Sequence, residues 1–155
     1  MKHFWCVLFV VCFVSAQPIQ TEPRKDWSWS SSFGFSSEKV TLSFYDVSLL
    51  YNIDENSELY GTLTSIGFIS GIGLGYKYYI GGKSKSSIFV NTGSQIYITN
   101  DPLDAGAALS TAAGLSLKKT GGKTSFNIGI SLLFLFEDYN DGELLIPFIN
   151  LQRRI

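Results

Sequence analysis

Cysteine and histidine are almost absent from this chain of 155 residues. The two cysteines are Cys6 and Cys12, and the one histidine is His3, so all three lie in an N-terminal leader. Without that leader the chain can form no disulfide and offers no thiolate or imidazole to zinc or copper. It also has no histidine for a Ser-His-Asp or Cys-His centre. We therefore expect a protein that is not an enzyme and that has no cofactor and no metal site.

Charge is scarce as well, because charged residues make up only 16% of the chain and the formal net charge is −1. A nucleic-acid-binding domain normally carries a basic face, so this balance argues against a nucleic-acid partner. Hydrophobic residues make up 45% of the chain, which argues against intrinsic disorder. The length fits a single domain.

The N-terminus has the layout of a secretory signal peptide. Lys2 precedes an unbroken apolar run from Phe4 to Val14, and a small residue, Ala16, follows. An apolar run of about 7–15 residues is typical of a signal peptide and is shorter than the roughly 20 residues of a membrane-spanning helix. We predict cleavage between Ala16 and Gln17. The predicted segments are a signal peptide (1–16), a short lead-in (17–26) and one domain (27–155).

From Trp27 onward, large apolar side chains recur at every second position, which is the signature of β-strands. The clearest run is Phe126, Ile128, Ile130, Leu132, Phe134 and Phe136. Turn signals rich in Gly, Asn and Asp separate the runs, and no segment shows a capped helical period. The pattern predicts eight strands, at 27–36, 39–52, 58–68, 71–80, 86–98, 106–118, 123–136 and 144–153.

The face opposite the apolar one is built of Gly, Ser, Ala, Asn, Thr and Gln, and Lys77 and Asp46 are nearly the only mid-strand charges. A soluble outer face would carry many more. Because the interior of an eight-stranded barrel has room only for modest side chains, we expect the small face to line the lumen. The apolar face then meets lipid.

The site residues follow from this assignment. We expect the six alternating residues from Phe126 to Phe136 to face lipid. Nine of the fifteen glycines share the small face, and Gly34, Gly61, Gly67 and Gly93 are among them. The residues expected to face the lumen are Gly71, Gly73, Gly75, Asn91, Gln95, Gly114, Asn127 and Gly129.

Two further features have alternative interpretations. The apolar parity switches within 39–52, which a bulge near Asp46 would explain. Tyrosines and tryptophans could form girdles at the membrane interface or be ordinary strand aromatics. The girdle candidates are Tyr76, Tyr78, Tyr79, Tyr97, Tyr139, Trp27 and Trp29.

The predicted connections at the two barrel ends differ in charge. The segments 100–105 and 138–143 form an acidic end, either a rim that binds divalent cations or a merely solvated one. The other end is basic, although acidic residues dilute it. Its lysines are Lys83, Lys85, Lys118, Lys119 and Lys123, and its acidic residues are Asp54, Glu55 and Glu58.

The export signal, the cysteine-free remainder and the serial amphipathic strands resemble small bacterial outer-membrane β-barrel proteins. The run from Gly71 to Tyr79, with glycine at every second position up to Gly75, is typical of that family's strands. The resemblance covers roughly residues 27–155. It implies an all-β fold, a single antiparallel up-and-down barrel of about eight strands of the membrane type. It also implies a place in the bacterial outer membrane, with outer-membrane lipid and the outer-membrane assembly machinery as partners.

Three functions remain open at this stage. The first is a small integral outer-membrane barrel, a monomer, with a non-catalytic role in envelope integrity or surface properties. The second is a secreted or periplasmic soluble barrel that binds an apolar ligand. The third is a narrow passive pore, although the lumen of an eight-stranded barrel is usually filled by its own side chains.

Overall fold

The computed structural model describes residues 27–35, 42–66, 69–98, 105–119, 122–136 and 142–155. The predicted signal peptide, its cleavage site and the lead-in lie outside the described residues. Within them, no helix is long and apolar enough to cross a membrane.

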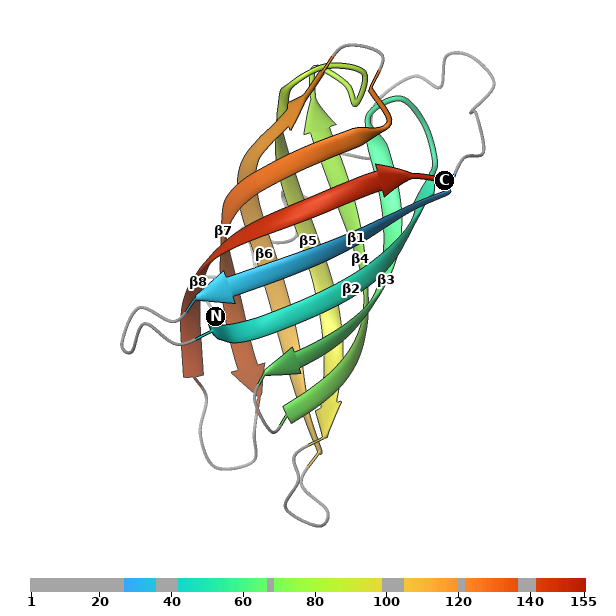
Figure 1. Cartoon of the computed structure of the whole chain (residues 1–155). Helices are drawn as coiled ribbons and strands as arrows, with labels where there is room; N and C mark the ends of the chain where they lie inside the picture. The colour runs from blue at the N-terminus through green and yellow to red at the C-terminus, as the bar shows by residue number, and fades with distance from the viewer. Residues whose placement is uncertain (1–26, 36–41, 67–68, 99–104, 120–121, 137–141) are drawn as a thin grey trace.

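Eight antiparallel strands close into one barrel in which each strand pairs with the next and β1 pairs with β8 (Figure 1). This confirms the predicted all-β, up-and-down fold. Alternating β-branched, aromatic and small residues suit a pleated surface with two different faces, and the strands follow the predicted runs to within a few residues. The strands are β1 (Trp27–Phe35), β2 (Leu42–Asn52), β3 (Ser57–Ile66), β4 (Ile69–Ile80), β5 (Ser87–Ile98), β6 (Ala105–Lys118), β7 (Thr124–Phe136) and β8 (Gly142–Arg154).

The barrel end at which β1 begins and β8 ends, drawn at the top of Figure 1, is here called the termini end. The backbone NH of Ile155 donates to the carbonyl of Trp27 at 2.9 Å, which ties the two strands together there. The β2–β3, β4–β5 and β6–β7 connections lie at this end. In the β4–β5 turn, Gly81 and Gly82 have φ angles of 90° and 88°, a conformation that only glycine adopts without strain.

The irregularity in β2 lies away from the predicted position. Asp46 pairs in regular register with Ser32, so no bulge occurs there. The register between β1 and β2 shifts instead between Gly34, whose partner is Phe44, and Phe35, whose partner is Leu42. The extra residue is thus Ser43, between the two apolar positions whose parity differs from the rest of the strand.

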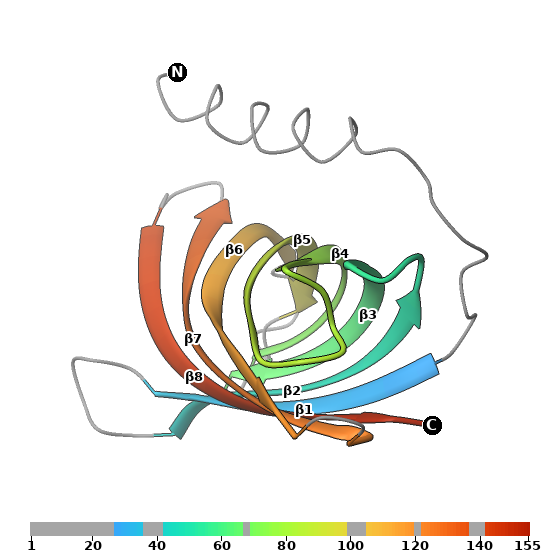
Figure 2. The same cartoon turned by 90° about the horizontal axis from the view of Figure 1, so that it is seen from above.

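Large aromatic side chains inside the barrel lie over glycines of adjacent or next-but-one strands. A Cβ atom added to any of these glycines would come closer than 3.0 Å to the ring or hydroxyl above it. The pairs are Tyr60 with Gly75 and Gly93, Tyr97 with Gly106, Phe89 with Gly114, and Phe148 with Gly129. The glycines therefore make room for specific aromatic rings, which is a more particular role than the narrow lumen alone predicts. The view along the barrel in Figure 2 shows the ring of strands that encloses these residues.

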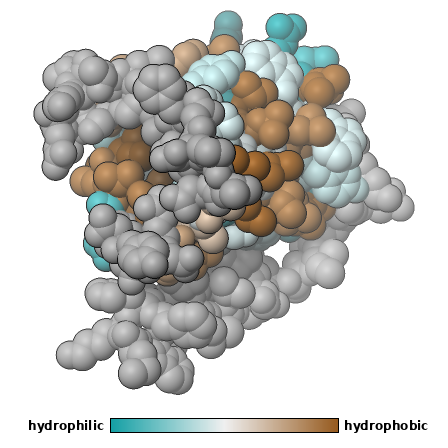
Figure 3. All heavy atoms as spheres, turned by 90° about the horizontal axis from the view of Figure 1, so that it is seen from below, coloured by the Kyte–Doolittle hydropathy of each residue, from teal (hydrophilic) through white to brown (hydrophobic). Residues whose placement is uncertain are grey.

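The outer wall is apolar. Large hydrophobic residues are exposed on every strand, and Leu74, at 71%, is among the most exposed. Brown, apolar residues group on the wall that is visible between the grey segments in Figure 3. Gly61 lies on this wall and not on the lumen face, which corrects the prediction, because its register partners are Leu49 and Leu74.

Candidate functional site in the barrel lumen

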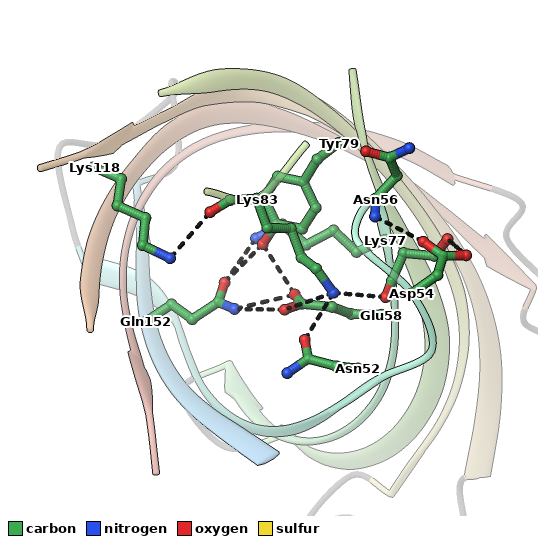
Figure 4. Close-up of polar contacts among 10 residues, drawn as sticks. Asn52, Asp54, Asn56, Glu58, Lys77, Tyr79, Lys83, Lys118 and Gln152 are labelled. Atoms are coloured by element: carbon green, nitrogen blue, oxygen red, sulfur yellow. Dashed lines mark hydrogen bonds and ion pairs between the residues drawn. The ribbon is translucent and has the colours of Figure 1, made fainter. Parts of the chain in front are cut away.

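A hydrogen-bonded group of side chains, the lumen partition, crosses the barrel interior near the termini end (Figure 4). Its members are Glu58 (β3), Lys77 and Tyr79 (β4) and Gln152 (β8). Glu58 and Lys77 are register partners on adjacent strands, so the fold brings a carboxylate beside an ammonium. All four side chains are buried, and Glu58 is only 2% exposed.

Gln152 joins the cation to the anion. Its Oε1 accepts a hydrogen bond from Lys77 Nζ at 3.1 Å, while its Nε2 donates to the two Glu58 oxygens at 3.2 and 3.0 Å. The Tyr79 hydroxyl lies 2.9 Å from both Glu58 Oε2 and Gln152 Oε1, so its one proton can be donated to either. A buried charge is tolerated when it is paired and hydrogen-bonded, and this group meets both conditions.

Lys83, from the β4–β5 turn, folds back over the mouth of the barrel. Its Nζ donates to Asn52 Oδ1 at 2.8 Å and to the carbonyl of Ser57 at 2.9 Å, and it lies 3.8 Å from Glu58 Oε1. Burial lowers the pKa of the Lys83 amine, and the facing Glu58 carboxylate opposes this shift. Lys83 therefore connects the turn to the lumen partition.

The lumen partition rests on an aromatic layer. Lys77 Nζ lies 4.3 Å from the centroid of Phe89 and 4.9 Å from that of Tyr79, within the range of a cation–π interaction. Phe89 also contacts Phe148, with ring centroids 6.3 Å apart. Together with Ala112, these rings form a buried cluster beside Lys77.

Two cavities lie on opposite sides of the lumen partition. The central cavity has a volume of about 80 Å³ and is bordered by Lys77 and by residues nearer the middle of the barrel, such as Asp46 and Tyr60. The mouth cavity has a volume of about 20 Å³ and is bordered by Glu58 and Gln152. No described residue lines both cavities; Lys77 borders the first, and Glu58, Tyr79 and Gln152 border the second, so the partition lies between them.

An amide ladder reinforces the wall where β7, β8 and β1 meet. Asn127 Nδ2 donates to Asn150 Oδ1 at 2.6 Å, and Asn150 Nδ2 donates to Ser32 Oγ at 2.7 Å. The two asparagines are register partners, and Asn127 is 0% exposed. The ladder therefore links the last two strands to the first from inside the barrel.

The structure places the sequence-predicted residues as follows. Among the six residues expected to face lipid, Phe126, Ile128, Ile130 and Phe136 are exposed on the outer wall, and Leu132 and Phe134 are half-buried. Among those expected in the lumen, Asn91 and Gln95 line the central cavity. Added Cβ atoms at Gly73, Gly75, Gly114 and Gly129 would collide with interior side chains or neighbouring backbone, and one at Gly71 would make tight contacts with Ile96 and Tyr97.

Sequence reasoning misplaced three polar or aromatic residues. Glu58 was expected among the turn charges at the basic end, but its side chain lies inside the barrel. Tyr79 and Tyr97 were candidates for an interface girdle and are instead buried in the lumen. The alternation along the strands could have placed two of them. Glu58 is an even number of residues from Thr62, and Tyr97 is an even number of residues from Gln95, so each lies on the strand face that lines the lumen. Tyr139 and residues 100–104 and 138–141 of the acidic end lie outside the described residues.

The remaining girdle candidates lie outside the lumen. Trp27 and Trp29 are exposed on β1, and the Trp27 ring contacts Tyr51 with centroids 5.0 Å apart. Tyr76 and Tyr78 are half-buried. Within the described part of the chain, no group of three or more His, Cys, Asp or Glu side chains could hold a metal ion.

The apolar outer wall, the polar lumen and the closed topology define the class of a transmembrane β-barrel. Solved structures with this fold include the N-terminal β-barrel domain of Pseudomonas aeruginosa OprF, with a TM-score of 0.64 and 13% identity over 86% of this chain and 100% of that chain. A de novo designed transmembrane β-barrel has a TM-score of 0.60 and 10% identity, covering 88% of this chain and 100% of the design.

The Yersinia pestis outer membrane protein Ail, in a phospholipid bilayer nanodisc, has a TM-score of 0.52 and 13% identity over 85% of this chain and 100% of that chain. No protein-family model matches this chain, and no curated protein matches it by sequence. At these identities the likeness shows the fold. The likeness therefore confirms, for the fold, the resemblance to outer-membrane β-barrels that the sequence suggested.

Proposed function

We propose that this protein is an integral outer-membrane β-barrel with a structural role in the cell envelope and without catalytic activity. The observation that carries the proposal is the combination of an apolar wall around all eight strands with a lumen crossed by the Glu58–Lys77–Tyr79–Gln152 partition. The first feature suits lipid, and the second suits a barrel that spans a membrane without transporting solutes.

The outer wall supports contact with lipid. Leu63, Ile72 and Ile96 are each more than 60% exposed, at 64%, 62% and 62%. Contiguous apolar surface of this kind in water promotes aggregation. A soluble barrel that holds an apolar ligand would have the reverse arrangement, because its lumen would be apolar. Here the central cavity is bordered by the charged residues Asp46 and Lys77 as well as by apolar side chains such as Leu133, so it is not a wholly apolar pocket.

The outer membrane is the proposed location because the export signal predicted in residues 1–16 and the similarity in fold to the outer membrane protein Ail support the same compartment. Insertion by the outer-membrane assembly machinery follows from that location as part of the proposal. A monomer is proposed as well, because every strand edge is paired within the chain and no edge remains to recruit a second copy.

A narrow pore is the second candidate, and the two cavities favour it. They lie on either side of a partition made only of side chains, so a rearrangement of Glu58 and Gln152 would join them.

Conductance in planar bilayers distinguishes the two functions. We expect the wild-type barrel to be silent and the Glu58→Ala/Gln152→Ala variant to conduct. The control is Glu55→Ala, which removes an exposed acidic residue in the β2–β3 turn. Steady conductance of the wild type would establish the pore and reject the closed barrel.

The structural role is tested in the organism that encodes the protein. Deletion of the gene should increase sensitivity to detergent and to large antibiotics that the envelope normally excludes. Expression of the wild type or of Glu55→Ala should restore resistance. An unchanged sensitivity profile in the deletion strain would reject the envelope role.

A further inference from the structure

The mouth cavity at the termini end gathers positive charge. Among the residues that the structure describes, four basic side chains line it, Lys83, Lys118, Lys123 and Arg154, and Glu58 is the one lining carboxylate. The cations come from three separate connections or strand ends, so it is the closed fold that brings them together. Lys118 Nζ donates to the carbonyl of Lys83 at 3.0 Å, which holds two of the cations side by side.

These charges are close enough to affect one another. Arg154 and Lys118 both contribute to the lowering of the Lys83 pKa, after the larger effect of burial, while Glu58 and Asp54 oppose it. The Glu58 carboxylate is engaged below by Gln152 and Tyr79. The mouth cavity therefore carries more positive charge than its own carboxylate balances, which favours an anion there.

Neutral donors line the same space. Ser28, Ser116 and Ser125 are buried at its walls, and each carries a hydroxyl that can donate to an anionic oxygen. The volume of about 20 Å³ is close to what one or two oxygen atoms occupy, since a water needs about 10–15 Å³ on the same scale. A ligand would therefore insert terminal oxygens and keep the rest of its mass outside.

We propose that the mouth cavity binds the terminal oxygens of a phosphate group, held by Lys118 and Lys123 with the serine hydroxyls behind. Phosphate fits better than carboxylate because it brings up to two negative charges and several terminal oxygens to a cavity with an excess of cations. Lysine recognises phosphate as a point charge and needs no planar partner. The group can belong to a lipid headgroup or to free phosphate. The proposal is independent of whether the lumen conducts.

The test uses the mature chain folded in a maltoside detergent, which contains no phosphate. Inorganic phosphate is titrated and its binding is followed by ³¹P line broadening, against chloride at equal ionic strength. The Lys118→Gln/Lys123→Gln variant removes two lining cations. The matched control, Lys85→Gln/Lys119→Gln, removes two exposed lysines of the same barrel end that do not line the cavity.

We expect saturable binding to the wild type, a loss of at least about tenfold in the lining variant, and a change of less than about twofold in the control. Lys123→Gln alone, at an exposed position, serves if the double variant does not fold. Equal losses in both double variants would indicate diffuse surface charge and overturn the site. Absence of saturable binding to the wild type by inorganic phosphate and by the lipid probes below would overturn it too.

The source of the phosphate is resolved by adding lipid to the micelles. Phosphatidic acid and phosphatidylglycerol are compared with phosphatidylcholine as competitors of inorganic phosphate. Displacement by an anionic lipid, lost in the Lys118→Gln/Lys123→Gln variant, assigns the site to a headgroup. Binding of inorganic phosphate that no lipid displaces assigns it to free phosphate.

Discussion

Glu58 is the carboxylate of the lumen partition. It accepts hydrogen bonds from Gln152 and Tyr79, and it faces Lys83 at 3.8 Å. Removal of the negative charge would leave the Lys77 and Lys83 ammonium groups without the carboxylate that compensates their burial. Loss of one partner of a buried pair is costly because the other charge stays desolvated.

We therefore expect Glu58→Gln to lower the free energy of unfolding by about 3–5 kcal/mol. Urea unfolding in lipid vesicles, followed by tryptophan fluorescence, measures this change. Glu55→Gln removes an acidic residue from the exposed β2–β3 turn and should stay within about 0.5 kcal/mol of the wild type. Comparable losses in both variants would mean that Glu58 is not a special member of the lumen.

The interior glycines lead to a second prediction at this scale. A Cβ atom at Gly114 would collide with the backbone of Ile128 and Gly129 and with the Phe89 ring. Because backbone cannot move aside cheaply, Gly114→Ala should cost about 1–3 kcal/mol by overpacking. Gly61→Ala is the matched control, since its nearest neighbour, Leu74 Cδ2, would lie at an ordinary 3.6 Å. The same urea titration applies, and a neutral Gly114→Ala would contradict the packing of Phe89.

Individual lumen residues were predicted unevenly from the sequence. The alternation of large apolar and small residues correctly assigned residues such as Asn127 to the lumen face. This assignment needs only the sequence of one strand and no knowledge of which strands pair with it. Glu58 was missed because a carboxylate beside a turn ordinarily faces water, and the partners that compensate its burial, Gln152, Tyr79 and Lys83, come from distant parts of the chain. Gly106 was missed in the same way, since its role depends on the ring of Tyr97.

The first half of β7 shows a clear division into two faces. Its outward residues are large and apolar, and its inward residues begin with Ser125, Asn127 and Gly129. Ile130 occupies the middle of the strand, is 53% exposed, and pairs with Ala113 and Pro147. This position is farthest from both barrel ends, where lipid would be most apolar.

We expect Ile130→Arg to destabilise the barrel by about 2–4 kcal/mol in vesicles, because a cation near the bilayer midplane is poorly solvated. Thr124→Arg, at the exposed first position of the same strand, should cost no more than about 1 kcal/mol. Unfolding titrations in vesicles compare the two variants. Equal and small costs would show that the outer wall of β7 does not contact the bilayer core.

Strand positions were predictable because every element carries its own period. Residues 58–80 could have formed one long strand, yet the structure has β3 and β4, paired from Ser57–Tyr78 to Ile66–Ile69. The bulge was harder to place. Parity shows that one residue is extra between Leu42 and Val47, but only the pairing with β1 decides that it is Ser43.

At the scale of the whole molecule, closure of the barrel stabilises the fold, as disulfide bonds do in many small exported proteins. Every strand has two hydrogen-bonded neighbours, so no edge is left open. An unpaired backbone group in lipid costs several kcal/mol, which makes partial unfolding within a membrane unfavourable. The barrel should therefore resist denaturing detergent until it is heated.

This resistance predicts two bands of different mobility in gel electrophoresis, one for the unheated and one for the boiled sample. The protein should also stay with the membrane after carbonate extraction. A protein that carbonate releases and that runs identically before and after boiling would reject the membrane assignment. The measurement is independent of the lumen and of the phosphate site.

The pairing of β1 with β8 has a consequence for the order of folding. Ser28 and Arg154 are partners although almost the entire domain separates them along the chain. Contacts between distant segments slow folding, so one edge of β1 stays unpaired until β8 pairs with it. A newly made chain is then at its most vulnerable to mispairing just before completion, and truncation of β8 should damage the whole barrel as severely as loss of β1.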